Sequence, residues 1–461
     1  MTSHDLPAET LPDPGHAHNQ NHKPNQNRYH DQNHNQTRIQ DQVQDQVRDQ
    51  EPGQVRDQVR DQDSALTAQS HNDWFGTDQL SARAKAWSNT MRGHDAPNAQ
   101  TTVRQAHETS SARVLVERPF LREEREAVEK TTLAQGATPS SGAGQRAIPE
   151  EPDPVRTCFE RDRDRILHGN AFRRLAGKTQ VFIFPGDHQR TRLTHALEVA
   201  QVSRSIAQAC RLNVALAEAI AIGHDCGHGP GGHASEDALS PYVREGYDHA
   251  VWGADVVLAP LNLCLETLDG VRNHSWSRPA PLTAEGEVVS WADRIAYVCH
   301  DFEDAVLAGL LTPDDLPGTV AAACGRTRSS QLNAFIAGIV ESVATTGIIG
   351  MTDHMASALA AFRTFNYERI YLRAESRQQA HRVTDLLQAL VEHYAKYPAQ
   401  LPGTWPRSAD LLDANETLRL RAAVTYVGGM TDRYACSRAI TDLGWDTSRL
   451  PTGIDVGALL G

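Results

Sequence analysis

The chain has 461 residues, of which 39% are hydrophobic and 6% aromatic, with 45 basic against 58 acidic side chains. The formal net charge of -13 argues against a general nucleic-acid binder, which needs a basic surface to displace counterions. No apolar run of about 18 residues and no apolar stretch of the signal-peptide type is present, so we expect no membrane span. The 7 cysteines are scattered without a CxxC pair, which is typical of reduced thiols and predicts a cytoplasmic location.

The first part of the chain is polar and of low complexity. Between Asp41 and Gln62 the units DQVQDQVRDQ and GQVRDQVRDQ recur. So few apolar residues cannot form a core, because burial would not offset the backbone entropy lost on ordering. We therefore predict a disordered His/Asn/Gln/Asp-rich tail over residues 1–110. Its early histidines are expected to be solvated, with loose metal binding as the alternative; they are His4, His16, His18, His22, His30 and His34.

The rest of the chain is predicted to be a helical body with short connecting segments. Residues 111–154 combine a helix-competent stretch with a Gly-, Ser- and Pro-rich linker from Gly136 to Pro154. The body is expected at 155–445 and a C-terminal tail at 446–461. Apolar residues at three- and four-residue spacing predict helices at 193–206, 214–222, 288–308, 332–343, 357–365 and 380–397. The best strand candidate is VFIF at 181–184, so we predict an all-α fold with minor short β pieces.

The strongest local signal is the sequence GHDCGHGPGGHASED at residues 223–237. It holds three histidines and three acids, and its glycines and Pro230 break any helix and allow tight backbone approach. Imidazole and carboxylate groups together are ligands for divalent transition metals or Mg²⁺. His224 and Asp225 follow directly on the apolar helix 214–222, so we expect one nitrogen and one oxygen ligand at a rigid edge.

Two residues elsewhere in the chain are predicted to complete a coordination set. His195, in RTRLTHALEVA, lies on an amphipathic helix and shares a face with Arg192. Asp293, in VVSWADRIAYVCHDFED, interrupts an apolar stretch, and an acid on a mostly buried helix needs a partner such as a cation. Asp293, Tyr297 and Asp301 follow one another at i, i+4 and i+8, so they share one side of the helix.

Each of these residues also has a structural alternative. His195 taken alone could be a hydrogen-bonded core histidine, and Asp293 alone could form a buried salt bridge with Arg294 or another base. The 223–237 cluster could be a structural zinc knot that uses Cys226, although its spacing fits no common zinc finger. The four residues together favour a metal centre, because independent accidents seldom assemble one complete coordination set.

A zone of positive charge lies inside this acidic chain. Residues 153–192 hold nine basic against five acidic side chains. A triphosphate requires such a zone, and arginine forks suit phosphate oxygens. The alternative, ion pairs on solvated helices, applies to Arg161, Arg163 and Arg165; it is weaker for Arg192, which shares a face with His195.

Five segments in chain order resemble the dGTP triphosphohydrolase (dNTPase) family of the HD-domain metallophosphohydrolases. They span about residues 150–440 and read FERDRDRILHGNAFRRLAGKTQVF, DHQRTRLTHALEVAQ, GHDCGHGPGGHASEDAL, WADRIAYVCHDFEDA and TYVGGMTDRYA. The resemblance implies a helical HD-domain fold in which His195, His224, Asp225 and Asp293 hold a divalent ion such as Mg²⁺ or Mn²⁺. It also implies hydrolysis of a deoxynucleoside triphosphate to deoxynucleoside and inorganic tripolyphosphate.

The resemblance assigns catalytic roles to residues near the HD pair. His233 and Glu236 match a histidine and an acid that take part in catalysis, and His228 and His249 match active-site histidines that contact the phosphates. We expect a metal-bound water to attack the α-phosphorus while His233, held by Glu236, protonates the departing 5′-oxygen. Arginines and His228 would offset the charge that develops on the polyphosphate.

Four further residues match substrate-binding positions of the family. Arg192 matches an arginine on the triphosphate and Gln180 a glutamine at the sugar's 3′-hydroxyl. Tyr297 and Asp301 match residues that line the sugar pocket, where crowding would select deoxyribose.

The chain also departs from the family pattern in two places. The family often has PFGH where this chain has Pro230-Gly231-Gly232-His233, and many members have an asparagine where this chain has Ala250. Both departures bear on substrate preference. A homo-oligomer is expected by resemblance only, and no feature indicates nucleic acid as a regulator.

Two other functions remain open from the sequence. One is an HD-domain phosphohydrolase that acts on a monophosphate or a signalling nucleotide. The other is a non-catalytic relative that binds a nucleotide or nucleic acid. The Arg192 segment argues against the first, because monophosphate enzymes need less cationic surface, and the intact His233 and Glu236 positions argue against the second.

Overall fold

The computed structural model describes residues 87–88, 91–96, 103–402 and 415–453, and the chain divides into two compact units, 1–116 and 117–461. In the first unit, β1 (His94–Asp95) pairs antiparallel with β2 (Arg104–Gln105). An ion pair of 3.0 Å between Asp95 and Arg104 joins the two strands. Most of the predicted tail, including its early histidines and its repeats, lies outside the described residues.

The second unit is built from helices, which confirms the predicted all-α class. Its α-helices are α4 (Arg122–Thr132), α5 (Cys158–His168), α6 (Asn170–Arg174), α7 (Arg192–Ala209), α8 (Val214–Gly223), α9 (Ala234–Leu239), α10 (His249–Trp252), α11 (Leu265–Asn273), α12 (Ala284–Leu307), α13 (Gly318–Cys324), α14 (Arg328–Thr346), α15 (Asp353–Asn366), α16 (Ala374–Lys396), α18 (Glu416–Gly428) and α19 (Asp432–Leu443).

Local sequence sets the starts of the helices that carry the site. Thr191 caps α7 by accepting from the backbone of Thr194, Asn213 caps α8, and Thr283 caps α12. These side chains satisfy amide groups that have no partner within the helix. The short polar residues between the apolar runs therefore fix where each site helix begins.

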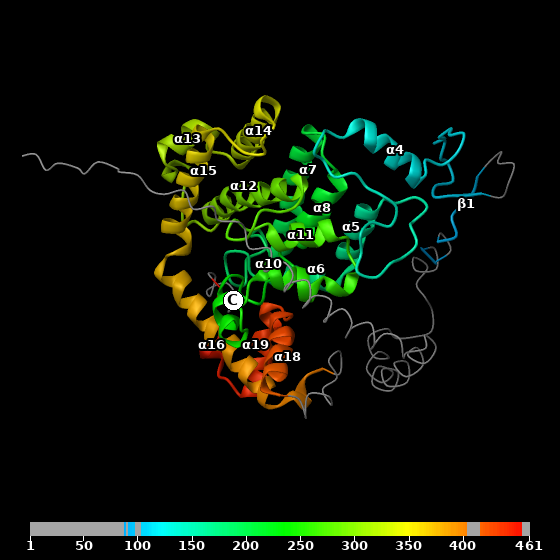
Figure 1. Ribbon diagram of the computed structural model, residues 1–461. Helices are drawn as coiled ribbons and strands as arrows, with labels where there is room; N and C mark the ends of the chain where they lie inside the picture. Colours follow the sequence, from blue (N-terminus) through cyan, green and yellow to red (C-terminus); the bar gives the residue numbers. More distant parts are fainter. Residues whose placement is uncertain (1–86, 89–90, 97–102, 403–414, 454–461) are drawn as a thin grey trace, which may run out of the picture. The chain divides into compact units, whose positions relative to one another are not determined.

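Helix α8 lies at the centre of the larger apolar core. Nearly all of its residues from Leu216 to Gly223 are buried, as expected for a helix that is apolar apart from Glu218. It packs against α5, α7, α11 and α12, and Figure 1 shows α7, α8, α11 and α12 close together in the middle of this unit. The turn that follows α8 is therefore enclosed by helices.

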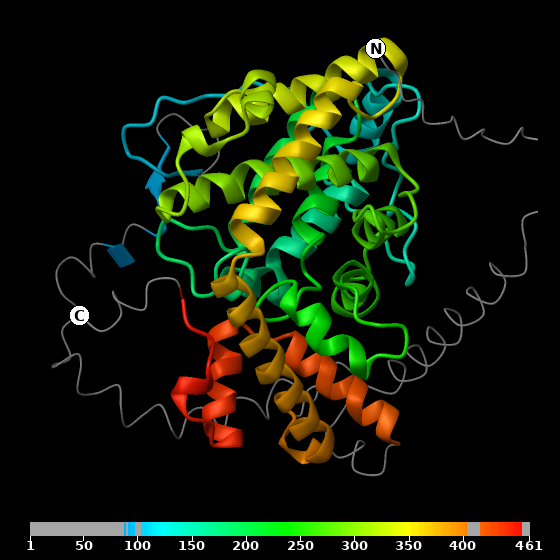
Figure 2. The same cartoon turned by 90° about the vertical axis from the view of Figure 1, so that its left-hand side faces the viewer.

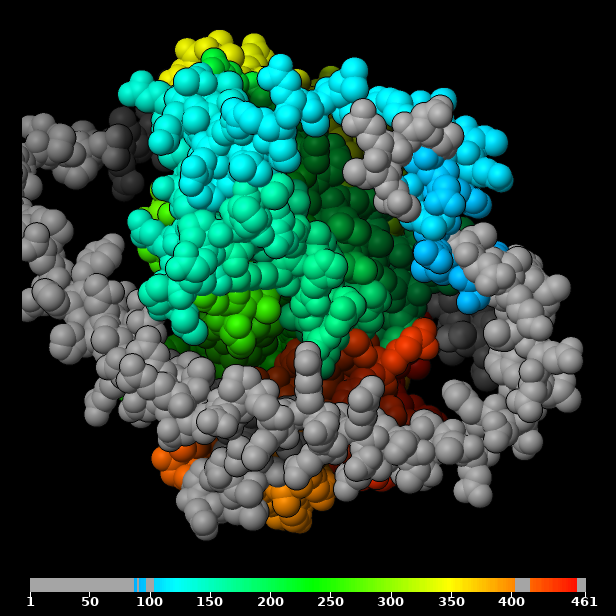
Figure 3. Space-filling view, turned by 90° about the vertical axis from the view of Figure 1, so that its right-hand side faces the viewer, coloured from blue at the N-terminus to red at the C-terminus, as the bar shows by residue number. Residues whose placement is uncertain are grey.

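A second apolar cluster joins the C-terminal helices to α9. Helix α16 packs against α9, α18 and α19, with Leu387, Leu390 and Tyr394 fully buried. Figure 2 shows α16 running from the α13–α15 helices to α18 and α19. Figure 3 shows the face opposite to the one in Figure 2. The segment that contains α4 and α5 lies on this face.

The structure corrects one sequence expectation and extends others. The segment 181–184 is not a strand: it forms bends, because Phe184 adopts a positive φ of 51° that breaks extended pairing. The predicted helices are present, and several are longer than expected, since caps such as Thr327 and Thr352 extend them beyond the apolar pattern. Within 136–154, Arg146 is buried and forms an ion pair of 2.6 Å with Asp162.

Candidate functional site

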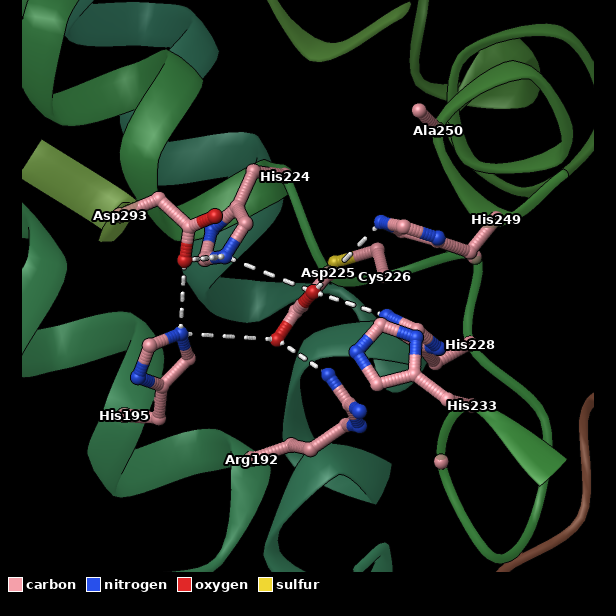
Figure 4. A network of polar contacts seen from close by, with 12 residues as sticks. Arg192, His195, His224, Asp225, Cys226, His228, His233, His249, Ala250 and Asp293 are labelled. Atoms are coloured by element: carbon pink, nitrogen blue, oxygen red, sulfur yellow. Dashed lines mark hydrogen bonds and ion pairs between the residues drawn. The ribbon is translucent and has the colours of Figure 1, made fainter. Parts of the chain in front are cut away.

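Three packed elements bring the four predicted metal ligands together. His195 comes from α7, His224 and Asp225 from the turn after α8, and Asp293 from α12. His195 Nε2 lies 3.1 Å from Asp293 Oδ1, and His224 Nε2 lies 3.4 Å from Asp225 Oδ1 and 3.6 Å from Asp293 Oδ1. Figure 4 shows the two rings and two carboxylates directed at one another. Such spacings fit ligands around one ion at about 2.0–2.2 Å.

The charges of this cluster favour a cation. Burial opposes ionisation of both carboxylates, yet Arg192 and His224 hold the pKa of Asp225 well below its usual range, and His195 and His224 do so for Asp293. Burial alone would lower the pKa of His224, but the two carboxylates raise it to about 9. Two ionised acids in a buried site need positive charge, which a divalent ion supplies.

The structure bears on two of the structural alternatives; the third stays open, because His195 is buried and its Nε2 is hydrogen-bonded to Asp293 at 3.1 Å. Arg294 does not pair with Asp293: it donates to the hydroxyl of Tyr297 at 3.2 Å and stacks on Trp276 at 3.9 Å. Cys226 donates to the carbonyl of Ile222 and belongs to none of the metal-compatible clusters among the described residues. His224 Nδ1 bonds to a backbone carbonyl, and its buried Nε2 has no hydrogen-bond partner. A ring that is oriented by a carbonyl and has a free second nitrogen suits a metal ligand.

Arg192 has donor groups without a protein acceptor. Its Nη1 bonds to Asp225 Oδ2 at 2.7 Å, while its buried Nε and Nη2 atoms have no partner. Three other arginines of the positive zone behave differently, since Arg161 and Arg165 pair with Glu150 and Arg163 pairs with Glu218. The positive zone is therefore not one phosphate-facing surface. Two unpartnered guanidinium donors beside the metal cluster suit an anionic ligand.

The residues after the HD pair form a connected group of histidines around one acid. Glu236 accepts from His249 Nδ1 at 2.6 Å and lies 3.3 Å from His233 Nδ1. Burial would raise the pKa of Glu236, but these bonds outweigh it and hold the pKa far below its usual range. His228 stacks on His249 with 3.7 Å between ring centroids, whereas the His233 side chain is 74% exposed. His233 is thus accessible to a ligand while Glu236 orients it.

Close backbone packing holds this histidine group in place. A Cβ on Gly227 would lie 2.0 Å from the carbonyl oxygen of His249, so only glycine allows the turn to meet α10. Asp432 accepts from the amides of Thr179 and Gly231 at 2.9 and 2.8 Å. Lys178, which the sequence did not single out, donates to the carbonyl of His228. These bonds tie the 225–233 turn to the segment before α7 and to the start of α19.

The residues predicted to bind the sugar do not form one connected group. Asp301 is buried on α12, where it accepts from the hydroxyl of Tyr371, and its Oδ1 has no partner. Tyr371 is the last residue of the π-helical turn Tyr367–Tyr371, and the spacing of residues in the sequence does not reveal such a turn. Tyr297 is half-buried and bonds to Arg294, and Gln180 has a buried Oε1 without a partner. No contact joins Gln180 to the metal cluster among the interactions of the described residues.

Comparisons with known proteins identify the family. Residues 192–298 match the HD domain, and residues 349–439 match the phosphohydrolase-associated domain. The chain is 38% identical over 322 residues to a deoxyguanosinetriphosphate triphosphohydrolase-like protein of Caldanaerobacter subterraneus, covering 68% of this chain and 93% of that one. The chain belongs to this family.

Another member of the deoxyguanosinetriphosphate triphosphohydrolase-like family, from Clostridium perfringens, is 36% identical over 329 residues, with 68% of this chain and 95% of that one covered. A member from Desulfatibacillum aliphaticivorans is 39% identical over 293 residues, covering 59% and 84%. HD-domain phosphohydrolases depend on metal ions, and the clustered ligands of this member agree with that dependence. In the part of the chain that the structure describes, no helix is both long and apolar enough to cross a membrane.

One family departure has a structural reason. Gly231 stands where the family pattern often has an aromatic residue, and it adopts a positive φ of 73°. A Cβ at this position would lie 2.5 Å from Cγ1 of Val383 on α16. In this member, Val383 on α16 therefore leaves no room for a side chain at position 231.

Asp301 makes a pH-dependent contribution to stability in this member. Burial raises its pKa from 3.8 to about 8, so folding favours the protonated acid, and this stability is lost as pH rises toward 8. We expect Asp301→Asn to have a larger free energy of unfolding than the wild type at pH 8. This difference in free energy should be smaller at pH 5, by on the order of 3 kcal/mol. Thermal unfolding at both pH values measures this gap, and a gap independent of pH would contradict the burial effect.

Proposed function

We propose that this protein is a metal-dependent deoxynucleoside triphosphate triphosphohydrolase that splits a dGTP-like substrate into deoxynucleoside and inorganic tripolyphosphate. One observation carries the proposal: Asp225, next to the metal-compatible cluster of His195, His224 and Asp293, bonds to Arg192, whose Nε and Nη2 donors are buried without a partner. The printed names of the relatives, which are deoxyguanosinetriphosphate triphosphohydrolase-like, support the same substrate class.

The chain positions the triphosphate next to the metal ligands. A divalent ion held by His195, His224, Asp225 and Asp293 would polarise a phosphate oxygen and acidify a bound water. Arg192 donates to phosphate oxygens through its free guanidinium edge while Nη1 stays on Asp225. The bond to Asp225 fixes Arg192 against the proposed metal ligands. Asp225 would therefore orient both the α-phosphorus and the attacking water.

The departing group needs a proton, which His233 is placed to give. As water adds to the α-phosphorus, the bond to the 5′-oxygen breaks, and His233 Nε2 donates its proton to that oxygen. Glu236 orients the ring through its contact with His233 Nδ1 at 3.3 Å. His228 is buried beside Arg192, which together with burial holds the pKa of His228 well below its usual range. His228 therefore acts as a neutral group at the polyphosphate.

The sugar specificity rests on α12. Asp301 and Tyr297 would border the deoxyribose, and their helix also carries Asp293. Tyr371 holds Asp301 in one orientation through its hydroxyl. A side chain locked in this way resists displacement by a 2′-hydroxyl, which favours deoxyribose over ribose.

The products distinguish this function from its rivals. Purified protein is incubated with each dNTP, each rNTP and dGMP in Mn²⁺ or Mg²⁺, and the phosphate products are separated by anion exchange. We expect tripolyphosphate from dNTPs and little from rNTPs. Monophosphate or pyrophosphate release would indicate another phosphohydrolase, and absence of any product would indicate a binding protein; either result would refute the proposal.

A further inference from the structure

A pair of buried thiols lies apart from the proposed metal site, at the starts of two helices. Cys158 is the first residue of α5, and Cys264 immediately precedes α11. A Cβ on Gly144 would lie 2.3 Å from the sulfur of Cys264 and 3.4 Å from the sulfur of Cys158. Both sulfur atoms therefore border the same glycine, although they are far apart in the sequence. Neither thiol belongs to a metal-compatible cluster among the described residues.

The surroundings of Cys158 favour its thiolate form. The thiol of Cys264 donates a hydrogen bond to the Cys158 sulfur, and this bond lowers the pKa of Cys158 below its ordinary value although burial opposes it. The amide of Ser141 donates to the same sulfur, and the start of α5 adds the positive end of the helix dipole. Arg146 and Asp162, which also lie near the thiols, pair with one another at 2.6 Å. The thiolate is the form of cysteine that reacts with oxidants, so Cys158 has the surroundings of a nucleophile with a second thiol in contact.

One layer of chain separates this pair from solvent. The loop over the thiols includes Ser141, whose side chain is exposed. Glu126 accepts from the amide of Gly142 at 2.9 Å, and the amide of Leu265 donates to the carbonyl of Gln145 at 2.8 Å. Local opening of a surface loop costs much less free energy than global unfolding. Such an opening would expose the thiols to a small oxidant while the helices stay folded.

We propose that Cys158 and Cys264 form a reversible modification site, in which hydrogen peroxide converts the two thiols into a disulfide. The thiolate of Cys158 attacks one oxygen of the peroxide, which breaks the O–O bond, releases hydroxide and leaves a sulfenic acid on Cys158. The sulfur of Cys264 then attacks the sulfenic sulfur, so that an S–S bond forms and the S–O bond breaks. The departing oxygen takes the Cys264 proton and leaves as water. The two thiols lose two electrons in all, and the peroxide becomes two molecules of water.

The disulfide would join two helices that flank the centre of the fold. Helices α5 and α11 both pack against α8, and His224 follows directly on α8. A covalent loop from Cys158 to Cys264 restricts the unfolded chain and thereby stabilises the folded one. The loop contains His195, His224 and Asp225, so oxidation would stabilise the framework that holds these proposed ligands. The modification itself does not depend on the proposed function.

Peptide mapping of the full-length protein tests the proposal. The reduced protein is treated with hydrogen peroxide under native conditions, blocked with N-ethylmaleimide and digested with trypsin in the absence of reductant. Cys158 lies in the tryptic peptide 157–161 and Cys264 in the peptide 245–272, and each peptide holds a single cysteine. We expect mass spectrometry to find these two peptides joined, and dithiothreitol to separate them. The midpoint of thermal unfolding should rise by about 5 °C on oxidation.

Serine variants make the result specific. Cys158→Ser and Cys264→Ser should lose both the joined peptides and the rise in the unfolding midpoint. Cys210→Ser removes another buried thiol, whose pKa is raised by burial, and should keep both effects. The mapping of the unmodified protein decides the outcome even where a serine variant fails to fold. Recovery of Cys158 in that protein as a free thiol, as a sulfinic acid, or joined to a different cysteine would overturn the inference.

Discussion

Asp293→Asn is expected to lower kcat for dNTP hydrolysis by at least about 10³-fold, which corresponds to about 4 kcal/mol of activation free energy. Asp293 Oδ1 lies within 3.6 Å of both His195 Nε2 and His224 Nε2, so it joins the two imidazole ligands. The neutral amide keeps the shape of the side chain but removes a negative charge that favours a cation. Turnover under saturating substrate and bound Mn²⁺ per chain measure the effect.

The matched control for this variant lies on the same helix. Glu303→Gln removes a carboxylate of α12 that pairs with Arg190 and Arg328 and does not contact the metal cluster. We expect its kcat and metal content to stay within about twofold of the wild type, because partly exposed ion pairs contribute little. If Asp293→Asn retained both turnover and metal content, the four-ligand assignment would be refuted.

Glu236→Ala is expected to lower kcat by about 10²- to 10⁴-fold, the usual contribution of a positioned acid or base. Glu236 contacts no reacting atom in the proposed mechanism: it acts by orienting His233. The ion of the four-ligand set should therefore stay bound, and KM should change much less than kcat.

The adjacent residue provides the control for Glu236. Asp237→Asn neutralises an exposed acid one position along the same short helix, and we expect near wild-type kinetics. Glu236→Gln, which keeps an acceptor oxygen, should fall between the alanine variant and the wild type. An unchanged kcat in Glu236→Ala would contradict the assignment of His233 as a general acid that Glu236 orients.

The sequence predicted the parts of the fold that depend on local pattern. Helices with strong apolar spacing, such as α8 and α12, are where the periodicity placed them, and Thr and Asn caps define their starts. The grouping of His195, His224, Asp225 and Asp293, which we propose as metal ligands, was also predictable, because each of them breaks an apolar or helical pattern with a polar side chain. A polar residue at a buried position is conspicuous even without a structure.

The rest depends on contacts between distant segments. The strand expectation at 181–184 was wrong because Phe184 turns the backbone, and β-branched residues alone do not reveal that turn. Spacing could not reveal that Val383 fills the space beside Gly231, or that Glu150 and Glu218 neutralise the arginines near α5. These partners lie tens to more than a hundred residues away in the chain.

His274 and Tyr371 were missed for the same reason. His274 lies in RNHSW, a short polar sequence with no helical period, and only the approach of α10 to α11 gives it a partner. Tyr371 reaches Asp301 because a π-helical turn shifts its direction relative to an α-helix. A search for histidines near Gly- and Asn-rich turns would have found His274 as a candidate, but not its partner.

The most direct test of the central claim is hydrolysis of dGTP in H₂¹⁸O, followed by mass spectrometry of both products. The account predicts tripolyphosphate that carries one ¹⁸O atom and unlabelled deoxyguanosine, because water adds to the α-phosphorus and the 5′-oxygen leaves with the nucleoside. Label in the deoxyguanosine, or release of orthophosphate or pyrophosphate in place of tripolyphosphate, would contradict it.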